Sequence, residues 1–396
     1  MDIQHITRLD EFDALREAWE STAAADPHAN VFVSWAWLRG WFEHCPHNWL
    51  VLAARPDAQS PHVGFLPLGI DPTPAWFRLD QQIILRLGAF PAADYTGFVC
   101  RPEHKRQALS AFADYVQNEL DWDRFEMREV SDPALGQWLQ EIDADQFDVA
   151  SSSATPCPQI DLTDDWEAYL RQCVSPATRK TLRRRLRGIE QLDGFNMTDA
   201  SDDNLAEQID TVLALWTRRW PGRATSQELD CWRSILTRCH QAGSLWLRVL
   251  WRDRTPIAAA AGFIDLPHRR FCGYILGVNP DFRDFSPGTV LIAHAIRDCI
   301  ERGLKHFDFL RGDEAYKYSF GATDRFNQNV TITRNRLRTT MRAATSRLRD
   351  RLAIRTRTRA ALDWLRQVLP QHHHSASDVT AEIPPQPSHG VTSGIM

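Results

Sequence analysis

The sequence lacks the motifs that mark several common enzyme classes. It has no Gly-x-Ser-x-Gly elbow, and no cysteine stands beside an obvious histidine partner, which excludes the usual nucleophilic hydrolases. It also has no Walker-type phosphate loop and no His-Glu-x-x-His motif. The 8 cysteines form no Cys-x-x-Cys pair and no Cys/His spacing typical of zinc. We therefore expect no metal, and buried free thiols in a reducing compartment.

Long apolar runs are missing as well. The longest, residues 257–264, is far shorter than the roughly 20 residues that span a bilayer. The N-terminus shows neither the basic region nor the apolar region of a signal peptide. These absences predict a cytoplasmic protein.

The composition is that of a folded protein with an uneven charge distribution. With 396 residues, 43% hydrophobic and 24% charged, the chain is long for one core and predicts two domains or two fused halves. Its net charge is −5, although residues 334–366 contain eleven arginines and only two aspartates. The remainder is therefore more acidic than the total indicates, which argues against a general nucleic-acid binder.

The order of expected elements repeats along the chain. The hairpin pattern of residues 50–70 is similar to that of 245–264, and the strand pattern of 122–130 is similar to that of 305–313. Residues 151–158 are small, polar and proline-containing, as in a linker. We predict an α/β (α+β) fold of two tandem halves, 1–150 and 151–338, each a mixed sheet flanked by helices.

Residues 278–324 combine a loop, a helix, a strand and a charged turn. The loop ends in Ser286-Pro287-Gly288-Thr289 and leads into an apolar helix over residues 290–302. A helix N-terminus of this kind offers unpaired N–H groups and the positive end of the helix dipole to a phosphate. The alternative interpretation is an ordinary crossover between two strands.

A charged cluster follows the next expected strand, residues 305–310. Phe307 and Phe309 point to one face and Asp308 to the other, and the strand leads into Arg311, Gly312, Asp313, Glu314, Tyr316 and Lys317. Ligands commonly bind at the carboxyl ends of strands in α/β sheets, which makes this cluster a candidate site. A solvated turn is the alternative.

The string from Phe307 to Ala322, FDFLRGDEAYKYSFGA, resembles the signature of GNAT-type acyltransferases of the CelD/BcsL group, which is associated with cellulose biosynthesis. That group is similar in turn to the FemAB-like peptidyltransferases. The resemblance also covers residues 175–190 and 243–264 and spans most of residues 3–334. It implies tandem GNAT-like halves and transfer of an acyl group from acetyl-CoA or another acyl-CoA.

The resemblance assigns roles around the loop and the cluster. It implies that the CoA pyrophosphate contacts Arg283, Ser286, Gly288 and Thr289, although Ser286 replaces a glycine of the usual pattern and its Cβ disfavours a positive φ. Asp308 and Glu314 are the candidate general bases, and Tyr316 is the candidate proton donor to the leaving thiolate. The alternatives are a buried Asp308–Arg311 ion pair and a core tyrosine.

Substrate contacts are predicted for four residues. Arg311 and Lys317 belong to the charged cluster, and Arg179 lies in an expected helix over 178–189 with six basic residues. That helix either neutralises an anion or presents a solvated face. Trp220, with the neighbouring Arg218 and Arg219, ends an expected helix over 211–220, where these side chains contact substrate or complement the helix C-terminus.

The C-terminal part is predicted to differ from the body. Residues 339–369 form an arginine-rich amphipathic helix, and residues 370–396 a disordered tail. The basic residues in 334–366 suit an anionic membrane surface or an acidic protein, whereas packing of the helix on the acidic body is the alternative. The first of these places the protein at the inner membrane face.

Three functions follow from these observations. The leading hypothesis is an acyl-CoA-dependent N- or O-acyltransferase acting on a sugar, a polysaccharide precursor or a small amine. The second is a FemAB-like transferase with an aminoacyl-tRNA donor, although no long coiled-coil insertion is present. The third is a non-catalytic accessory protein of a membrane-associated glycan-synthesis complex. Beyond these, no specific nucleic acid is expected as a partner.

Overall fold

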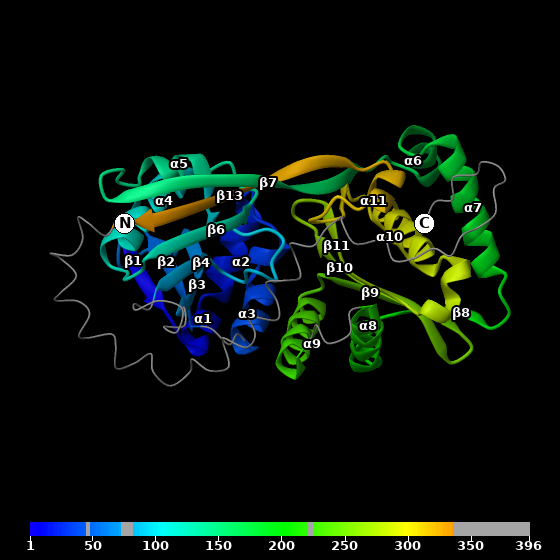
Figure 1. Ribbon diagram of the computed structural model, residues 1–396. Coiled ribbons are helices and arrows are strands. Elements are labelled where there is room, and N and C mark those ends of the chain that lie inside the picture. Colours follow the sequence, from blue (N-terminus) through cyan, green and yellow to red (C-terminus); the bar gives the residue numbers. More distant parts are fainter. Residues whose placement is uncertain (45–47, 73–81, 220–224, 336–396) are drawn as a thin grey trace. The chain divides into compact units, whose positions relative to one another are not determined.

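The computed structural model describes residues 1–44, 48–72, 82–219 and 225–335, which divide into two compact units (Figure 1). Unit 1 holds Met1–Thr155, Ser226–Ala242 and the described residues from Phe326 onward. Unit 2 holds Pro156–Thr225 and Gly243–Arg325. Trp220, the predicted helix over 339–369 and the predicted tail over 370–396 lie outside the described residues.

The sheet of unit 1 has the order β1-β2-β3-β4-β6-β13. All neighbours are antiparallel except β4 and β6, which are parallel. The apolar run from Leu50 to Ala54 is buried throughout, so both faces of this strand are covered. The strands are β1 (Asp2–Ile6), β2 (Asn48–Arg55), β3 (Gly64–Pro72), β4 (Ile83–Leu87), β6 (Arg124–Val130) and β13 (Thr323–Arg334), with the short β5 (Val99–Cys100) beside β3.

The helices of unit 1 cover this sheet. The central one, α4 (Lys105–Asn118), turns Ala108, Leu109 and Phe112 into the core at helical spacing. The first two helices are separated at Leu15, and residues 94–98 are a loop that leads into β5. The others are α1 (Leu9–Ala14), α2 (Arg16–Ala25), η1 (Val31–Val33), α3 (Trp35–His44), η3 (Pro102–His104), α5 (Leu135–Gln140) and α9 (Ser226–Gln241).

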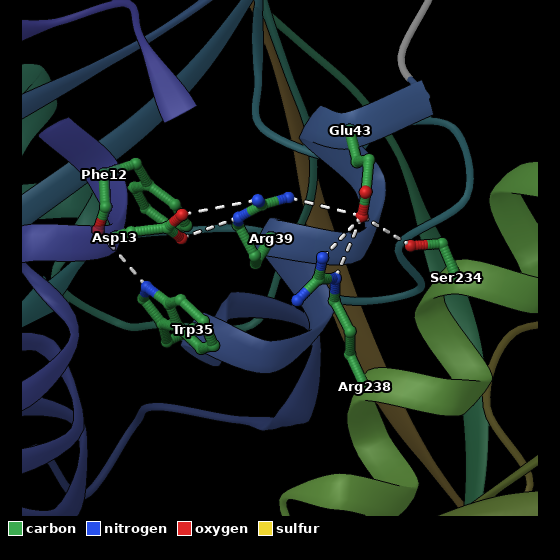
Figure 2. A network of polar contacts seen from close by, with 7 residues as sticks. All are labelled: Phe12, Asp13, Trp35, Arg39, Glu43, Ser234 and Arg238. Carbon is green, nitrogen blue, oxygen red and sulfur yellow. Dashed lines mark hydrogen bonds and ion pairs between the residues drawn. The ribbon is translucent and has the colours of Figure 1, made fainter. Parts of the chain in front are cut away.

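One helix joins unit 1 from far along the chain. A Cβ on Gly40 of α3 would lie 2.7 Å from the Cα of Ile235 in α9, so the glycine lets the two helices touch. Glu43 accepts hydrogen bonds from Arg238 Nη2 at 2.7 Å and Ser234 Oγ at 3.0 Å (Figure 2). Arg39 continues the network to Asp13 at 2.6 Å. These contacts fix α9 on α3.

The sheet of unit 2 has the order β7-β12-β11-β10-β9-β8. Here β11 and β12 are the parallel pair, and the other neighbours are antiparallel. The strands are β7 (Phe147–Asp161), β8 (Phe195–Asp199), β9 (Leu245–Arg252), β10 (Thr255–Asp265), β11 (Arg270–Val278) and β12 (His306–Asp308). The helices are α6 (Trp166–Gln172), α7 (Pro176–Glu190), α8 (Leu205–Arg219), η4 (Pro280–Phe285), α10 (Pro287–Glu301) and α11 (Ala315–Ser319).

The two units share one topology, which confirms the predicted tandem α/β halves. In unit 1 the hairpin β2–β3 is followed by β4, α4 and the parallel strand β6. In unit 2 the hairpin β9–β10 is followed by β11, α10 and the parallel strand β12. In each unit an antiparallel edge strand, β1 or β8, completes the hairpin side.

The last strand of the unit 1 sheet follows unit 2 in the chain, whereas the last strand of the unit 2 sheet directly precedes the rest of that unit. Unit 1 ends in β13, where Val330 pairs with Met127, and unit 2 ends in β7, where Ile160 pairs with Phe307. The predicted linker over 151–158 therefore lies inside a strand. Its first four side chains, residues 151–154, are exposed while the backbone is extended, and exposed side chains carry no apolar pattern.

No helix in the described ranges has the length and apolar character needed to cross a membrane. The described cysteines are free thiols, most of them buried.

Candidate active site

A cavity of about 420 Å³ opens in unit 2 at the N-terminus of α10. All four predicted donor-binding residues line it, and so does the predicted proton donor Tyr316. Leu276, Val278 and Ile292 form an apolar wall, and Arg218, near the end of α8, lines it as well. The sequence therefore identified residues that the fold brings together.

The loop that leads into α10 has a defined turn. Asn279 Oδ1 accepts from the N–H of Asp281 at 3.2 Å and starts η4. Ser286 N–H donates to the carbonyl of Arg283 at 2.8 Å. Contrary to the preference of a residue with a Cβ, Ser286 has φ of +51°, a conformation that costs about 1 kcal/mol. Serine thus occupies the left-handed position here, and the turn exists without the glycine.

This turn leaves the first N–H groups of α10 without helix partners. The first bond within the helix runs from Val290 N to Ser286 O at 3.3 Å, and Pro287 has no N–H. The N–H groups of Gly288 and Thr289 therefore have no acceptor in the helix. A Cβ on Gly288 would lie 3.0 Å from Val278 Cγ2, so the glycine keeps the helix end close to β11.

The cavity is lined by positive charge. Arg218 and Arg283 are both exposed, and neither side chain has a carboxylate partner within the described part of the chain. The positive end of the α10 dipole adds to them. Such a cavity attracts an anion, because two guanidinium groups and two N–H groups can donate to it.

Helix α7 contacts the same loop. Arg185 Nη1 donates to Thr289 Oγ1 at 3.4 Å, and burial together with the nearby charge of Arg184 lowers the pKa of Arg185. Thr289 and Tyr316 also border a second hollow of about 20 Å³ next to α7. Arg185 was not among the predicted site residues, although it follows Leu182 by three positions and so lies beside the buried stripe of this helix.

The predicted substrate contact Arg179 lies away from the cavity lining. Its Nη2 donates to the carbonyl of Val174 at 3.2 Å, near the start of α7. Its role in substrate binding stays a prediction, as does that of Trp220.

Asp308 holds the turn that follows β12. Its carboxylate is fully buried and accepts from Gln159 Nε2 at 2.8 Å and from the N–H of Leu310 at 2.8 Å. The second bond stabilises Leu310 at φ of +61°. Asp308 is not among the cavity-lining residues, so its role as a base remains a prediction.

Lys317 is enclosed by the turn of the charged cluster. Its side chain is 3% exposed, and its ammonium donates to the carbonyl oxygens of Leu310, Arg311 and Gly312 at 3.3, 2.7 and 3.0 Å. It also pairs with Glu314 Oε2 at 2.9 Å, whose side chain is 56% exposed. The adjacent Tyr316 packs its ring edge on Phe309 and reaches the cavity.

Comparison with known proteins identifies this region. Residues 176–318 match the family model described as an acetyltransferase (GNAT) domain. The chain carries a GNAT acetyltransferase domain. This domain makes the protein an acyltransferase, as the sequence predicted. No curated protein matches the chain at a significant level.

Solved structures share the fold of this chain at low identity. FemX is 13% identical with a TM-score of 0.57, and the alignment covers 83% of this chain and 97% of FemX. The C-terminal domain of a putative lysylphosphatidylglycerol synthetase from Agrobacterium fabrum is 11% identical, with a TM-score of 0.52 and coverage of 83% and 92%. The L-PGS of Bacillus licheniformis is 9% identical, with a TM-score of 0.50 and the same coverage of 83% and 92%.

Proposed function

We propose that this acyltransferase takes its acyl group from an acyl-CoA and transfers it to a nitrogen or oxygen of a sugar, a polysaccharide precursor or a small amine. The observation that carries the proposal is the cavity at α10, where Arg218 and Arg283 face an open helix N-terminus without a described carboxylate partner. The resemblance to the CelD/BcsL group supports a glycan acceptor.

The residues present fit the chemistry of CoA. The N–H groups of Gly288 and Thr289 and the two guanidinium groups suit its pyrophosphate. The apolar wall of Leu276, Val278 and Ile292 suits its pantetheine arm. The cavity volume of about 420 Å³ lies in the range of small-molecule sites.

The reaction needs one proton acceptor and one proton donor. The nitrogen or oxygen of the acceptor substrate loses a proton to the base and bonds to the acyl carbon. The carbon–sulfur bond of the thioester then breaks, and the sulfur takes a proton from the donor. Tyr316 is our candidate for supplying that proton, because it lines the cavity. Neither carboxylate lines the cavity, but Glu314 is 56% exposed and lies two residues before Tyr316, whereas Asp308 is buried and holds the turn. We therefore assign the base to Glu314 and a positioning role to Asp308.

The test is isothermal titration of acetyl-CoA into the full chain and two variants. Arg218→Ala and Arg283→Ala should each weaken binding about tenfold, more at low salt, because each removes a charge-assisted contact. Arg254→Ala, in the exposed turn between β9 and β10, is the matched control and should bind like the wild type. Unchanged affinity in both cavity variants would reject the proposed donor site.

A second candidate is a transferase with an aminoacyl-tRNA donor. Lys180, Arg184 and Arg187 are exposed at i, i+4 and i+7 along α7, and none has a carboxylate partner within the described ranges. This basic stripe suits a nucleic-acid backbone. The structural similarity to FemX and to a lysylphosphatidylglycerol synthetase, which by its name makes a lysyl lipid, also supports this candidate.

One triple variant separates the two donors. Replacing Lys180, Arg184 and Arg187 by glutamate reverses the charge of the basic stripe but leaves the residues that line the cavity unchanged. If the donor is an aminoacyl-tRNA, the wild type binds tRNA in a salt-dependent manner and the variant does not. If the donor is acyl-CoA, both proteins bind acetyl-CoA equally and neither retains tRNA at physiological salt.

A further inference from the structure

The shared topology defines the position in unit 1 that corresponds to the donor cavity. In unit 2, Asn279 N–H donates to Ile257 O at 2.9 Å and precedes Pro280, η4 and α10. In unit 1, Arg101 N–H donates to Val63 O at 2.9 Å and precedes Pro102, η3 and α4. The start of α4 is therefore the counterpart of the start of α10.

A buried charge cluster occupies this counterpart position. Lys105, the first residue of α4, places its ammonium 2.8 Å from Asp132 Oδ2 and 3.1 Å from Asp26 Oδ1. The two carboxylates are 3% and 0% exposed. Asp26 Oδ2 also accepts from the N–H of Cys100 at 2.9 Å, and Asp132 Oδ1 accepts from the N–H of Ala134 at 2.8 Å.

The backbone at the two positions differs as well. In unit 1, η3 runs directly into α4, with Lys105 at φ of −55°. In unit 2, the left-handed Ser286, with φ of +51°, separates η4 from α10 and opens the helix end to the cavity. The turn that exposes the N–H groups in unit 2 is therefore replaced by a continuous helical path in unit 1.

The charges at the two positions are opposite. Two carboxylates and one ammonium give the cluster itself a net negative charge, and its buried carboxylates repel an incoming phosphate. Burial lowers the pKa of Lys105, but Asp132 and Asp26 more than offset this and raise it, which keeps the ammonium charged. Unit 2 presents Arg218 and Arg283 instead.

We infer that each chain binds one donor molecule, in unit 2, and that unit 1 has lost its donor site to the cluster of Asp26, Lys105 and Asp132. This inference rests on the proposed acyl-CoA donor. It gives unit 1 a role other than donor binding.

Stoichiometry tests the inference, with acetyl-CoA as the probe and the full chain as the protein. Native mass spectrometry and equilibrium titration should give one acetyl-CoA per wild-type chain. Gly288→Glu changes the second residue of α10 and should remove that site. Arg106→Glu changes the second residue of α4, which is exposed, and should leave both stoichiometry and affinity within a factor of two of the wild type.

Each outcome decides a different question. Two molecules per wild-type chain, or weaker binding in Arg106→Glu, would overturn the inference and leave the proposed function standing. No binding by the wild type would overturn both the inference and the proposed function.

Because Gly288 is buried, Arg283→Glu at an exposed position serves as the second variant. It should also lose the single site, and retention of one full-affinity site in both variants would place binding outside the α10 cavity.

Discussion

The ammonium of Lys317 donates to the carbonyl oxygen of Arg311 at 2.7 Å, inside the turn that carries the charged cluster. Two residues of this turn, Leu310 and Gly312, have positive φ values of +61° and +105°. Their carbonyls also point at the same ammonium. The lysine therefore compensates an unusual backbone path, and through it sets the position of the adjacent Tyr316.

Replacing Lys317 by methionine should destabilise the protein by about 3 kcal/mol, because three carbonyls of the turn lose the buried ammonium that is their shared donor. The free energy of unfolding from urea titration measures this. Lys305→Met removes the exposed pair with Asp164 and should change stability by less than about 1 kcal/mol. Equal losses in the two variants would show that the turn does not depend on the buried ammonium.

Gly277→Ala should destabilise unit 2 by about 2 kcal/mol, because the new Cβ would lie 2.6 Å from Leu215 Cβ and 2.7 Å from the backbone of Trp216. Relief requires α8 to move, and with it Arg218 at the cavity, so weaker acetyl-CoA binding should accompany the lower melting temperature. Gly273→Ala in the same strand meets its nearest atom at 3.6 Å and should be tolerated. The prediction fails if both alanines behave alike.

His294 should make stability depend on pH between about 6.5 and 4. Burial, and next the charges of Arg248 and Arg297, lower the pKa of this side chain to about 4 in the folded state. The unfolded chain then binds the proton first as pH falls from 6.5, so stability is full above that value and is lost toward pH 4. The loss is at most about 3 kcal/mol for this group.

Urea titrations of the wild type and His294→Gln at pH 7.5, 6, 5 and 4 check this. The difference in unfolding free energy between the two proteins should shrink or reverse as pH falls, because the variant has no proton to bind. A difference that stays constant across the series would contradict the assignment. The values at pH 7.5 serve as the reference, since both forms are neutral there.

Tyr316→Phe should slow acyl transfer about a hundredfold while the affinity for acetyl-CoA stays within a factor of three, because only the proton donor is removed. Thiol release from acetyl-CoA with a panel of amino sugars and small amines measures the rate. Tyr318→Phe is the control, because that hydroxyl bonds to Asp324 at 2.8 Å on the surface. Wild-type turnover by Tyr316→Phe would remove Tyr316 from the mechanism.

Much of the fold follows from short-range patterns in the sequence. In the hairpins β2–β3 and β9–β10, apolar residues alternate with polar ones or follow one another in short runs. Helix α10 carries an apolar stripe, and Gly303 follows its C-terminus. These signals were enough to predict two tandem halves. The loop from Arg283 to Thr289 was also predicted as a unit, because a proline-glycine pair before an apolar run is a local signal.

The pairing of β13 with the sheet of unit 1 was not predictable in the same way. In the pairing of β13 with β6, Val330 lies opposite Met127, and the described residues of unit 2 lie between these two positions in the sequence. Such pairing rests on backbone hydrogen bonds, which no residue type encodes. The assignment of α9 to unit 1 depends on Gly40 accepting a helix from far along the chain. At the site, the burial of Asp308 and Lys317 arises from the tertiary turn, whereas their sequence context suggested contact with ligand.

The late position of β13 in the chain also sets the order in which the two units can be completed during synthesis. Synthesis proceeds from the N-terminus, and every described residue of unit 2 has been made once Arg325 is added. At that moment unit 1 still lacks β13, and strand β6 has no partner on that side of its sheet. The half of the chain that the ribosome makes first is thus the half that finishes folding last, and a nascent chain stalled before residue 326 presents an open sheet edge to the cell.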